Sequence, residues 1–271
     1  MRIAIQGQKG AFHEIASHRV WKDQDLDIVY CETFEDVFKK VKNGQVDFGV
    51  TAVENSLYGS ILATYDLLLN QGLWIAGEIT LHIHQQLISH PEARLEDIKE
   101  VYSQTFALEQ CRRWLSEHIP NAELIEFHDT AASVRYIKEK GLRHAAAIAS
   151  DKAAEDYDMP ILARDIEDEE NNFTRFIVIS KEEIDNPNAN RASLSMTAHH
   201  KPGALYGALG ILFNLGINLT KLESRPIRNE RFLYQFIVEL EADKIKLDSA
   251  VEQLKDYGCD VTVLGHFVTH E

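Results

Sequence analysis

Short apolar runs alternate with amphipathic segments along residues 1–75. Runs at 2–6, 27–31 and 46–50 predict buried strands, because each is short and bounded by turn residues. Thr33 predicts the N-cap of a helix that ends at Gly44, and Ser60 predicts the cap of a second helix that ends at Gly72. Because strands and helices alternate, the pattern predicts an α/β fold with a parallel, doubly wound sheet.

The pattern changes at 73–89, where apolar and polar residues alternate without a helix. This stretch predicts one long strand that crosses to a second lobe. A second strand–helix series follows, and residues 160–162 lead the chain back to the first lobe, whose sheet is completed by an apolar run at 173–180. The members of the second series are strands at 100–102, 123–127 and 145–149, a helix at about 105–118, a helix capped by Asp129 or Thr130 and ended by Gly141, and a short helix capped by Ser150.

Residues 181–191 are polar and contain the run Asn186-Pro187-Asn188-Ala189-Asn190, which breaks both helix and strand and so predicts a linker. The rhythm after it is different, in the order βαββαβ, which is typical of an α+β ferredoxin-like domain. The predicted strands lie at 192–198, 219–224, 232–240 and 260–268, and the helices at 203–215 and 247–257.

The composition and net charge of the chain argue against several classes of function. The chain has 271 residues, 45% of them hydrophobic, and a formal net charge of −15. An acidic chain is a poor partner for nucleic acid or for an anionic membrane, since both need basic surfaces. The cysteines Cys31, Cys111 and Cys259 are too widely spaced for a zinc pattern. The chain opens on a strand and shows no apolar stretch long enough to span a bilayer. We therefore expect a soluble cytoplasmic protein.

Two polar stretches lie at the ends of predicted strands. Residues 171–176 open the strand at 173–180 with an amide, the Thr174 hydroxyl and the Arg175 guanidinium, which can bind a carboxylate in a bidentate manner. Residues 51–60 follow the strand at 46–50. Ligands of doubly wound sheets bind at such strand ends. A binding site is one interpretation of these residues, and a satisfied strand start with a surface arginine is the other.

Two further patterns have a functional and a structural interpretation. Gly7 and Gly10 join a strand to a helix, which favours an anion-binding nest of free N–H groups, or else a tight turn that needs glycine. His13, on the following helix, is expected at the surface. His82 and His84 alternate on one strand, but no third or fourth ligand is evident, so no metal site is predicted.

Taken together, these motifs resemble those of prephenate dehydratases followed by an ACT domain, and they cover nearly the whole chain in the expected order. The resemblance implies a two-lobed catalytic domain at 1–181, similar to type II periplasmic binding proteins. Lobe one would comprise about 1–75 and 160–181, lobe two about 76–159, and the ACT domain 191–271. The motifs are the residues at 7–12, 54–56, 129–133, 146–150, 172–176, 203–205 and 223–226.

The resemblance also implies a reaction without a cofactor. Prephenate would lose CO₂ and its ring hydroxyl to give phenylpyruvate. Thr174 would donate to the leaving hydroxyl, assisted by Glu54 with a raised pKa, while Asn55 orients the groups. Arg175 would either clamp a carboxylate or pair with the acidic run before it. Phe176 or Leu57 would supply an apolar wall. The implied substrate-binding residues are Ser56, Ser103, Gln110, Thr130, Arg175 and Phe176.

The ACT-like segment implies regulation. L-phenylalanine would bind there and inhibit, with its carboxylate at the helix that begins near Gly203. Paired ACT domains would make the protein a homo-oligomer, a dimer or a tetramer. The implied effector-binding residues are Gly203, Ala204, Leu205, Glu223, Ser224, Arg225 and Pro226.

Two other functions remain open. Arogenate dehydratase acts on a substrate that differs by an amino group in place of the keto group, and the motifs barely separate the two enzymes. A non-catalytic amino-acid sensor with two lobes is the other alternative. Because the chain begins at its first strand, we expect no chorismate mutase helix before it.

Overall fold

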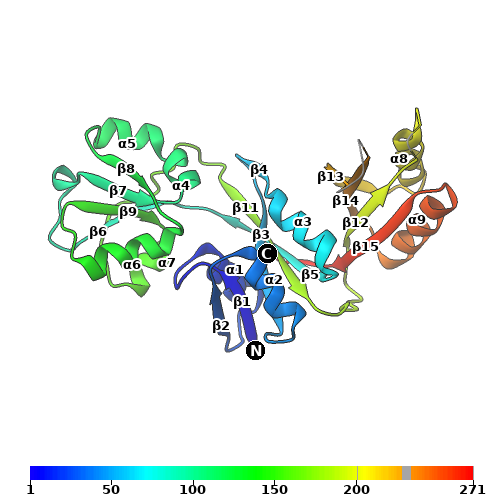
Figure 1. Cartoon of the computed structure of the whole chain (residues 1–271), viewed down its shortest axis with the longest axis horizontal. Coiled ribbons are helices and arrows are strands. Elements are labelled where there is room, and N and C mark those ends of the chain that lie inside the picture. Colours follow the sequence, from blue (N-terminus) through cyan, green and yellow to red (C-terminus); the bar gives the residue numbers. More distant parts are fainter. Residues whose placement is uncertain (200, 228–232, 271) are drawn as a thin grey trace.

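The computed structural model describes residues 1–199, 201–227 and 233–270. Three bodies follow one another along the long axis of the molecule (Figure 1). Lobe one lies in the middle, lobe two at the green end and the C-terminal domain at the yellow and red end. Within the described residues, no helix is long and apolar enough to cross a membrane.

Lobe one is built on a seven-stranded sheet in the order β16-β5-β11-β3-β1-β2, with β4 paired to β3. Strand β11 lies at its centre and runs antiparallel to both neighbours. Val178 of β11 pairs with Val50, so the strand at 173–180 joins the first lobe as predicted. The elements are β1 (Arg2–Gln6), α1 (Phe12–Val20), β2 (Asp27–Cys31), α2 (Phe34–Lys42), β3 (Phe48–Asn55), β4 (Gly59–Ser60), α3 (Leu62–Gln71), β5 (Trp74–His82), β11 (Phe173–Ser180) and β16 (Thr269–His270).

Lobe two is built on a five-stranded sheet in the order β10-β6-β9-β7-β8. Its central strand β9 is an alanine-rich run that is buried along its whole length, which suits a strand covered by helices on both faces. The elements are β6 (Gln86–Ser89), the 3₁₀ turn η1 (Leu95–Asp97), β7 (Glu100–Ser103), α4 (Thr105–Gln110), α5 (Arg112–His118), β8 (Glu123–Glu126), α6 (Thr130–Lys140), β9 (Ala145–Ala149), α7 (Asp151–Asp156) and β10 (Ile161–Ala163).

The predicted lobe boundaries are wrong in two places. The stretch at 73–89 is two strands, and β5 pairs with β11 in lobe one whereas β6 pairs with β9 in lobe two. The crossing therefore occurs at 83–85 and not at 76. The return strand β10 pairs with β6, so it belongs to lobe two and not to lobe one. The polar run His84-Gln85-Gln86 interrupts the apolar alternation close to this break, a signal that the prediction of one continuous strand did not use.

Two predicted helix boundaries are also wrong. The helix at 105–118 breaks at Cys111, because Asp168 accepts hydrogen bonds from the backbone N–H groups of Arg113 and Trp114 and so caps α5 from the return segment. Ser60 does not cap α3, whose N-cap is Ile61. The Ser60 hydroxyl instead donates to Glu223 of the C-terminal domain at 2.7 Å.

The C-terminal domain has the predicted βαββαβ order. Its antiparallel sheet has the strand order β13-β14-β12-β15, and the two helices pack on one face over a single apolar core. Phe232, the predicted first residue of the third strand, lies outside the described residues. The elements are β12 (Arg191–Thr197), α8 (Ala204–Asn214), β13 (Asn218–Pro226), β14 (Tyr234–Glu241), α9 (Lys244–Asp256) and β15 (Asp260–Phe267).

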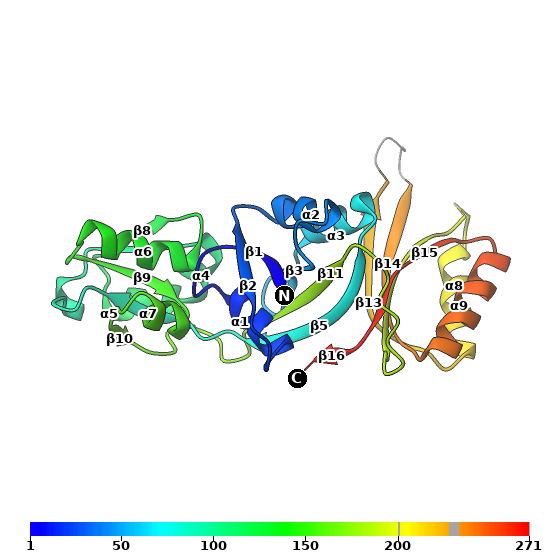
Figure 2. The ribbon, with the colours of Figure 1, turned by 90° about the horizontal axis from the view of Figure 1, so that it is seen from below.

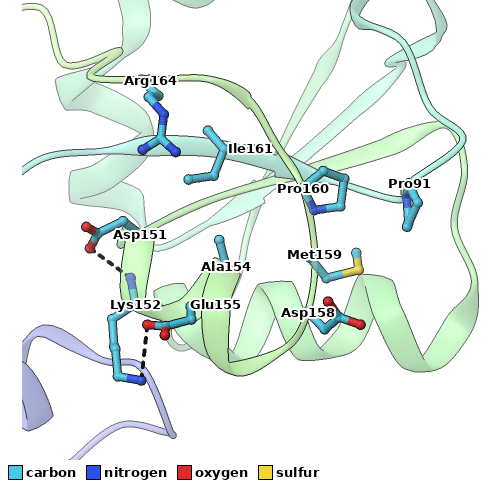
Figure 3. Close-up of a pocket in the computed structure, with 10 residues that line it drawn as sticks. All are labelled: Pro91, Asp151, Lys152, Ala154, Glu155, Asp158, Met159, Pro160, Ile161 and Arg164. Atoms are coloured by element: carbon cyan, nitrogen blue, oxygen red, sulfur yellow. Dashed lines mark hydrogen bonds and ion pairs between the residues drawn. The ribbon is translucent and has the colours of Figure 1, made fainter.

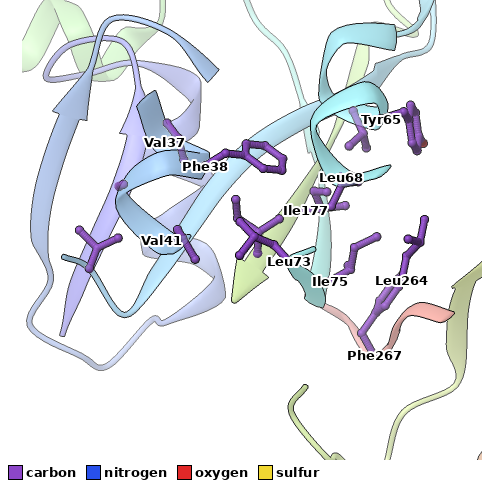
Figure 4. Close-up of a cluster of buried hydrophobic side chains, with 14 of the residues drawn as sticks. Val37, Phe38, Val41, Tyr65, Leu68, Leu73, Ile75, Ile177, Leu264 and Phe267 are labelled. Atoms are coloured by element: carbon purple, nitrogen blue, oxygen red, sulfur yellow. The ribbon is translucent and has the colours of Figure 1, made fainter. Parts of the chain in front are cut away.

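The other face of that sheet packs on lobe one. Leu264 and Phe267 belong to the same buried cluster as Ile75 and Ile177 of lobe one (Figure 4). After β15 the chain forms β16, which pairs in parallel with β5 at the edge of the lobe-one sheet (Figure 2). The C-terminal domain is thus joined to lobe one by a shared core and a shared sheet.

Candidate functional site

Thr174 lies where β11 leaves lobe one, beside the end of β3. The Asn55 side-chain amide donates to Thr174 Oγ1 at 3.0 Å, to Asn172 Oδ1 at 2.9 Å and to the backbone carbonyl of Phe173 at 3.1 Å. The Asn55 carbonyl oxygen accepts from the backbone of the following loop. Because Thr174 accepts from Asn55, its own hydroxyl proton can be directed at a ligand. Among the described residues we find no acceptor for that proton.

Gln110 joins this group from lobe two. Its amide nitrogen lies 3.3 Å from Asn172 Oδ1, and its oxygen accepts from Gln85 Nε2 at 2.9 Å. Asn172 is fully buried, Gln85 and Gln110 nearly so. In the described part of the chain, Asn172 Nδ2 and Gln85 Oε1 are buried without a hydrogen-bond partner. A chain of neutral amides therefore crosses between the lobes at Thr174, with one donor and one acceptor unused.

Ser56 and Ser103 are held by backbone groups. The Ser56 hydroxyl donates to the carbonyl of Asn171 at 2.6 Å and accepts from the N–H of Phe173 at 2.9 Å. Ser103 is fully buried and donates to the carbonyl of Ile148 at 2.6 Å. In this structure both hydroxyls bind backbone groups around the site.

The glycine turn is a contact between the lobes and not an open nest. The N–H of Gly10 donates to Glu14, and the Gly10 carbonyl accepts from Ser150 Oγ of lobe two at 2.6 Å. A Cβ at Gly10 would lie 2.5 Å from Ala153 Cα, and φ at Gly10 is +85°. Thr130 begins α6 next to Asp129, which packs on Gly7 in the same way. Glycine is needed here for close approach of the lobes.

Phe176 is core, not a wall of the site, since only 1% of it is exposed. Its ring packs edge-on against His13 at a centroid distance of 5.1 Å. His13 was expected at the surface, but it is partly buried between Phe176 and Phe34, and the N–H of Ala52 donates to its Nε2 at 3.3 Å. Burial lowers the pKa of His13 to about 4, so the ring is neutral at neutral pH.

Arg175 points to the opposite side of β11, into a cluster of buried carboxylates. Its Nη1 binds Glu54 at 2.8 Å, and its Nη2 binds Glu78 at 2.9 Å and Glu239 of the C-terminal domain at 2.7 Å. Glu54 also accepts from Lys221 at 2.9 Å. Arg175 therefore neither clamps a free carboxylate nor pairs with the acidic run at 165–170, and both oxygens of Glu54 are engaged by cations.

Comparison with known proteins decides the family. Residues 3–184 match the family model for prephenate dehydratase, and residues 192–259 match the model for the ACT domain. The chain belongs to the prephenate dehydratase family. It is 38% identical to the bifunctional chorismate mutase/prephenate dehydratase of Aquifex aeolicus over 88% of this chain and 65% of that protein, so it spans less than two thirds of that relative.

Solved structures agree on the fold of this dehydratase family member. The prephenate dehydratase of Arthrobacter aurescens in complex with L-Phe has a TM-score of 0.89 at 28% identity, over 99% of this chain and 90% of that one. A protein described as the quorum quenching acylase GqqA has a TM-score of 0.88 at 29% identity, over 98% and 97% of the two chains. The two-lobed fold with a C-terminal ACT domain is therefore established, and similar folds carry more than one named activity.

The ACT domain contains a cavity of about 390 Å³ at the start of α8. Ala204 and Leu205, both predicted to bind an effector, line it. The segment at 223–226 does not line it within this single chain, and its predicted role, to close the pocket from a paired subunit, stays a prediction. Glu223 instead accepts from Ser60, and Arg225 forms a bidentate pair with Asp66 of lobe one at 2.7 Å. The cavity is lined by Ala198, His199, Lys201, Pro202, Ala204, Leu205, Leu233, Tyr234 and Phe236.

A larger cavity of about 740 Å³ lies on lobe two (Figure 3), and Thr174 is not among the residues that line it. Lys152, Glu155, Asp158 and Arg164 line it with mixed charges, and none of the predicted site residues takes part. The predicted site residues Asn55, Thr174 and Gln110 belong instead to the amide chain described above.

His84 is where the structure comes closest to a metal site. Its Nδ1 lies 2.9 Å from Glu167 and 3.4 Å from Asp165, two carboxylates of the return segment that were not recognised as neighbours from the sequence. The three ligand atoms lie within 4.8 Å of one another. The contacts with Glu167 and Asp165 already give the Nδ1 atom of His84 its polar partners, so the arrangement itself does not require a metal.

Sequence reasoning missed five residues of this region: Gln85, Asn172, Glu78, Lys221 and Glu239. Asn172 stood inside a recognised motif but only its neighbours were assigned roles. Glu78 and Glu239 each interrupt an apolar strand, and a charged residue in such a place must be paired, so this signal was available. Nothing in the sequence indicated that both carboxylates meet at Arg175.

Proposed function

We propose that this chain converts prephenate to phenylpyruvate. The C–C bond to the departing carboxylate breaks and releases CO₂. The electron pair enters the ring as it becomes aromatic, and the ring C–O bond breaks. The leaving hydroxyl takes up one proton and departs as water. Aromatisation drives the step, so no electron carrier is needed, and the site has to supply orientation and a proton.

The observation that carries this proposal is the state of the Thr174 hydroxyl. Asn55 donates to its oxygen at 3.0 Å, which turns the hydroxyl proton away from Asn55 and toward the junction of the lobes. A hydrogen bond to a leaving oxygen stabilises the charge that develops in the transition state. Asn172 Nδ2 and Gln85 Oε1 are an unused donor and an unused acceptor in the same amide chain, and because both atoms are buried, a substrate group or a water reaches them only when neighbouring side chains move.

Glu54 is not supported as the proton source. Arg175 and Lys221 engage its two oxygens, so neither oxygen is available to a substrate hydroxyl or to Thr174 in this arrangement. We therefore assign Glu54 the support of its neighbour Asn55. The proton that Thr174 delivers is then replaced from solvent or from the substrate itself.

The test is turnover of prephenate by the full chain, followed by the absorbance of phenylpyruvate. Thr174→Ala should lower kcat by about 10²–10⁴, the range for loss of a positioned proton donor. Thr174→Ser keeps the hydroxyl and should retain most of the activity. Arogenate and an acyl amide are assayed in parallel, because they represent the two other activities. Turnover of Thr174→Ala within about threefold of wild type would show that Thr174 is not the donor.

We also propose that L-phenylalanine binds the ACT cavity and inhibits, and that two or more copies associate through this domain. The support is the cavity at the N-terminus of α8, where free N–H groups suit a carboxylate and Leu205 and Phe236 suit a ring. Calorimetric titration of L-phenylalanine into the full chain tests it. Gly203→Val should abolish binding, since φ at Gly203 is +82°. Unchanged binding by this variant would place the effector elsewhere.

A further inference from the structure

Two residues of the C-terminal domain reach the catalytic motifs of lobe one. Lys221, from β13, donates to Glu54 Oε1 at 2.9 Å and to Ser60 Oγ at 2.7 Å. Glu239, from β14, accepts from Arg175 at 2.7 Å and from the Tyr65 hydroxyl at 2.9 Å. The side chains of Lys221 and Glu239 are only 7% and 5% exposed, so these are buried contacts and not surface ion pairs.

Their targets flank the groups that do the chemistry. Glu54 immediately precedes Asn55, and Arg175 immediately follows Thr174. Glu54 and Arg175 are also register partners of β3 and β11, as are Asn55 and Thr174. The backbone that carries the Asn55–Thr174 hydrogen bond is therefore fixed on its other side by the Glu54–Arg175 ion pair. Any displacement of that pair moves the two catalytic groups with it.

We propose that Lys221 and Glu239 are positioning residues, through which the ACT domain holds the catalytic loop of lobe one in its working geometry. This proposal rests on the proposed function in one respect, because prephenate turnover is the reaction whose rate the positioning residues would affect. Lys221 holds Glu54, Glu239 holds Arg175, and the two contacts together clamp the end of β3 against the start of β11. The regulatory domain is in this sense part of the support of the active site.

The Lys221–Glu54 and Glu239–Arg175 contacts, here called the clamp, are buried, so each depends on both of its members being present. Removing one member of a buried charge pair leaves the other charge without compensation, and the remaining group then reorients toward water or another partner. A displacement of about 1 Å of a catalytic group costs on the order of 10²-fold in rate. Loss of Lys221 or Glu239 should consequently appear in kcat, because the substrate-binding groups of lobe two are untouched.

The experiment uses the full chain with prephenate. Lys221→Met and Glu239→Gln keep side-chain length and remove the charge. We expect kcat to fall by about 10- to 100-fold with KM within about threefold of wild type, and Lys221→Arg to recover most of kcat. Asp66→Asn is the matched control. It removes the charge of another ion pair between the two domains, to Arg225, that contacts neither Glu54 nor Arg175. Its kcat should stay within about twofold of wild type.

A second readout is independent of the reaction. The N–H groups of Leu57 and Tyr58 donate to Asn55 Oδ1, so hydrogen exchange of the loop at 54–60 reports whether the loop is held. Exchange there should be faster in Lys221→Met and Glu239→Gln than in wild type or Asp66→Asn. If the loop at 54–60 exchanges slowly in wild type and faster in the two variants, but wild type does not turn over prephenate, the proposed function is wrong and the clamp is still supported.

Three results would overturn the clamp. The first is wild-type kcat and wild-type loop exchange in both Lys221→Met and Glu239→Gln. The second is an equal loss in Asp66→Asn, which would show that the effect is domain docking in general. The third is an effect on KM alone. Should Lys221→Met fail to fold, Glu239→Gln decides, because it keeps the size of the side chain and one acceptor oxygen while it removes the charge and the second acceptor.

Discussion

The two faces of β11 differ in kind. One face carries Thr174 and Phe176, which meet the neutral amides at the lobe junction and the uncharged ring of His13. The other face carries Arg175, which meets three carboxylates at the boundary with the ACT domain. Because successive side chains of a strand point to opposite faces, one peptide bond separates a neutral environment from a strongly charged one.

This difference separates two tasks. Neutral donors and acceptors can bind polar groups of a substrate without holding a charged product too firmly, which suits a reaction that releases CO₂. Buried charges do not suit substrate binding of this kind, but they require specific partners, since an unpaired buried charge lowers the stability of the fold. The neutral face is thus suited to chemistry and the charged face to joining domains. The three predictions below test this division from the largest expected effect to the smallest.

Arg175→Met should have the largest effect on stability. It leaves Glu54, Glu78 and Glu239 facing one another with Lys221 as the remaining cation among these residues, so the free energy of unfolding should fall by about 3–5 kcal/mol. The control is Arg2→Met, which removes an exposed ion pair with Asp27 and should cost less than about 1 kcal/mol. Urea denaturation measures both. Equal small losses would mean that the charged cluster does not hold the domains.

Protonation of His13, which packs on the neutral face of β11, should lower the stability of the folded protein in acid. Burial lowers the pKa of His13 to about 4 in the folded protein, against an ordinary value of 6.5, so the unfolded chain takes up the proton first as the pH falls. Stability is fully present above about 6.5 and is lost as the pH falls to about 4, by up to about 3 kcal/mol. His13→Gln keeps an acceptor for Ala52 and does not titrate. Denaturation measured between about pH 6.5 and pH 4 should show a smaller loss of unfolding free energy for the variant than for wild type. An equal loss in both proteins would contradict the assignment of His13 as neutral in the folded state.

Glu78→Gln should have the smallest effect, and a favourable one. Burial raises the pKa of Glu78 although Arg175 opposes the shift, with the nearby Glu239 adding to it and Arg191 opposing it. Its contribution to stability is therefore present below about 4.5 and is lost as the pH rises through the higher folded pKa. At neutral pH the variant should be equal to wild type or more stable by up to about 1 kcal/mol, with the difference shrinking in acid. A clear loss at neutral pH would show that all three carboxylates are needed.

The sequence predicted the elements of this molecule better than their boundaries. Periodicity is a local signal, so it found the strand at 173–180 and the βαββαβ order. It missed the break in 73–89, because both halves are extended and partly apolar, and the polar run His84-Gln85-Gln86 between them was predicted to be part of one strand although the halves pair with different sheets. Ser60 looked like a helix cap because its true partner, Glu223, is distant in the sequence.

The candidate site shows the same limit. Thr174 and Asn55 were predicted from motifs, and the structure brings them into contact. Glu54 was predicted to assist Thr174, and Arg175 to clamp a carboxylate or to pair with the acidic run, but the structure turns both toward other charged partners. Phe176 was predicted, as an alternative to Leu57, to form an apolar wall, and the structure buries it. Which face of a strand a residue occupies depends on register and on what packs there, and the ACT domain that covers Arg175 follows β11 in sequence.

The last described strand, β16, has a consequence for synthesis on the ribosome. It pairs with Glu78 and Ile79 at the edge of the lobe-one sheet, so this part of the edge stays unpaired until residues 269–270 have emerged. An exposed edge strand is a template for pairing with other chains. Nascent lobe one is therefore exposed to misassembly while the ACT domain is being made, and removal of β16 would leave this part of β5 unpaired.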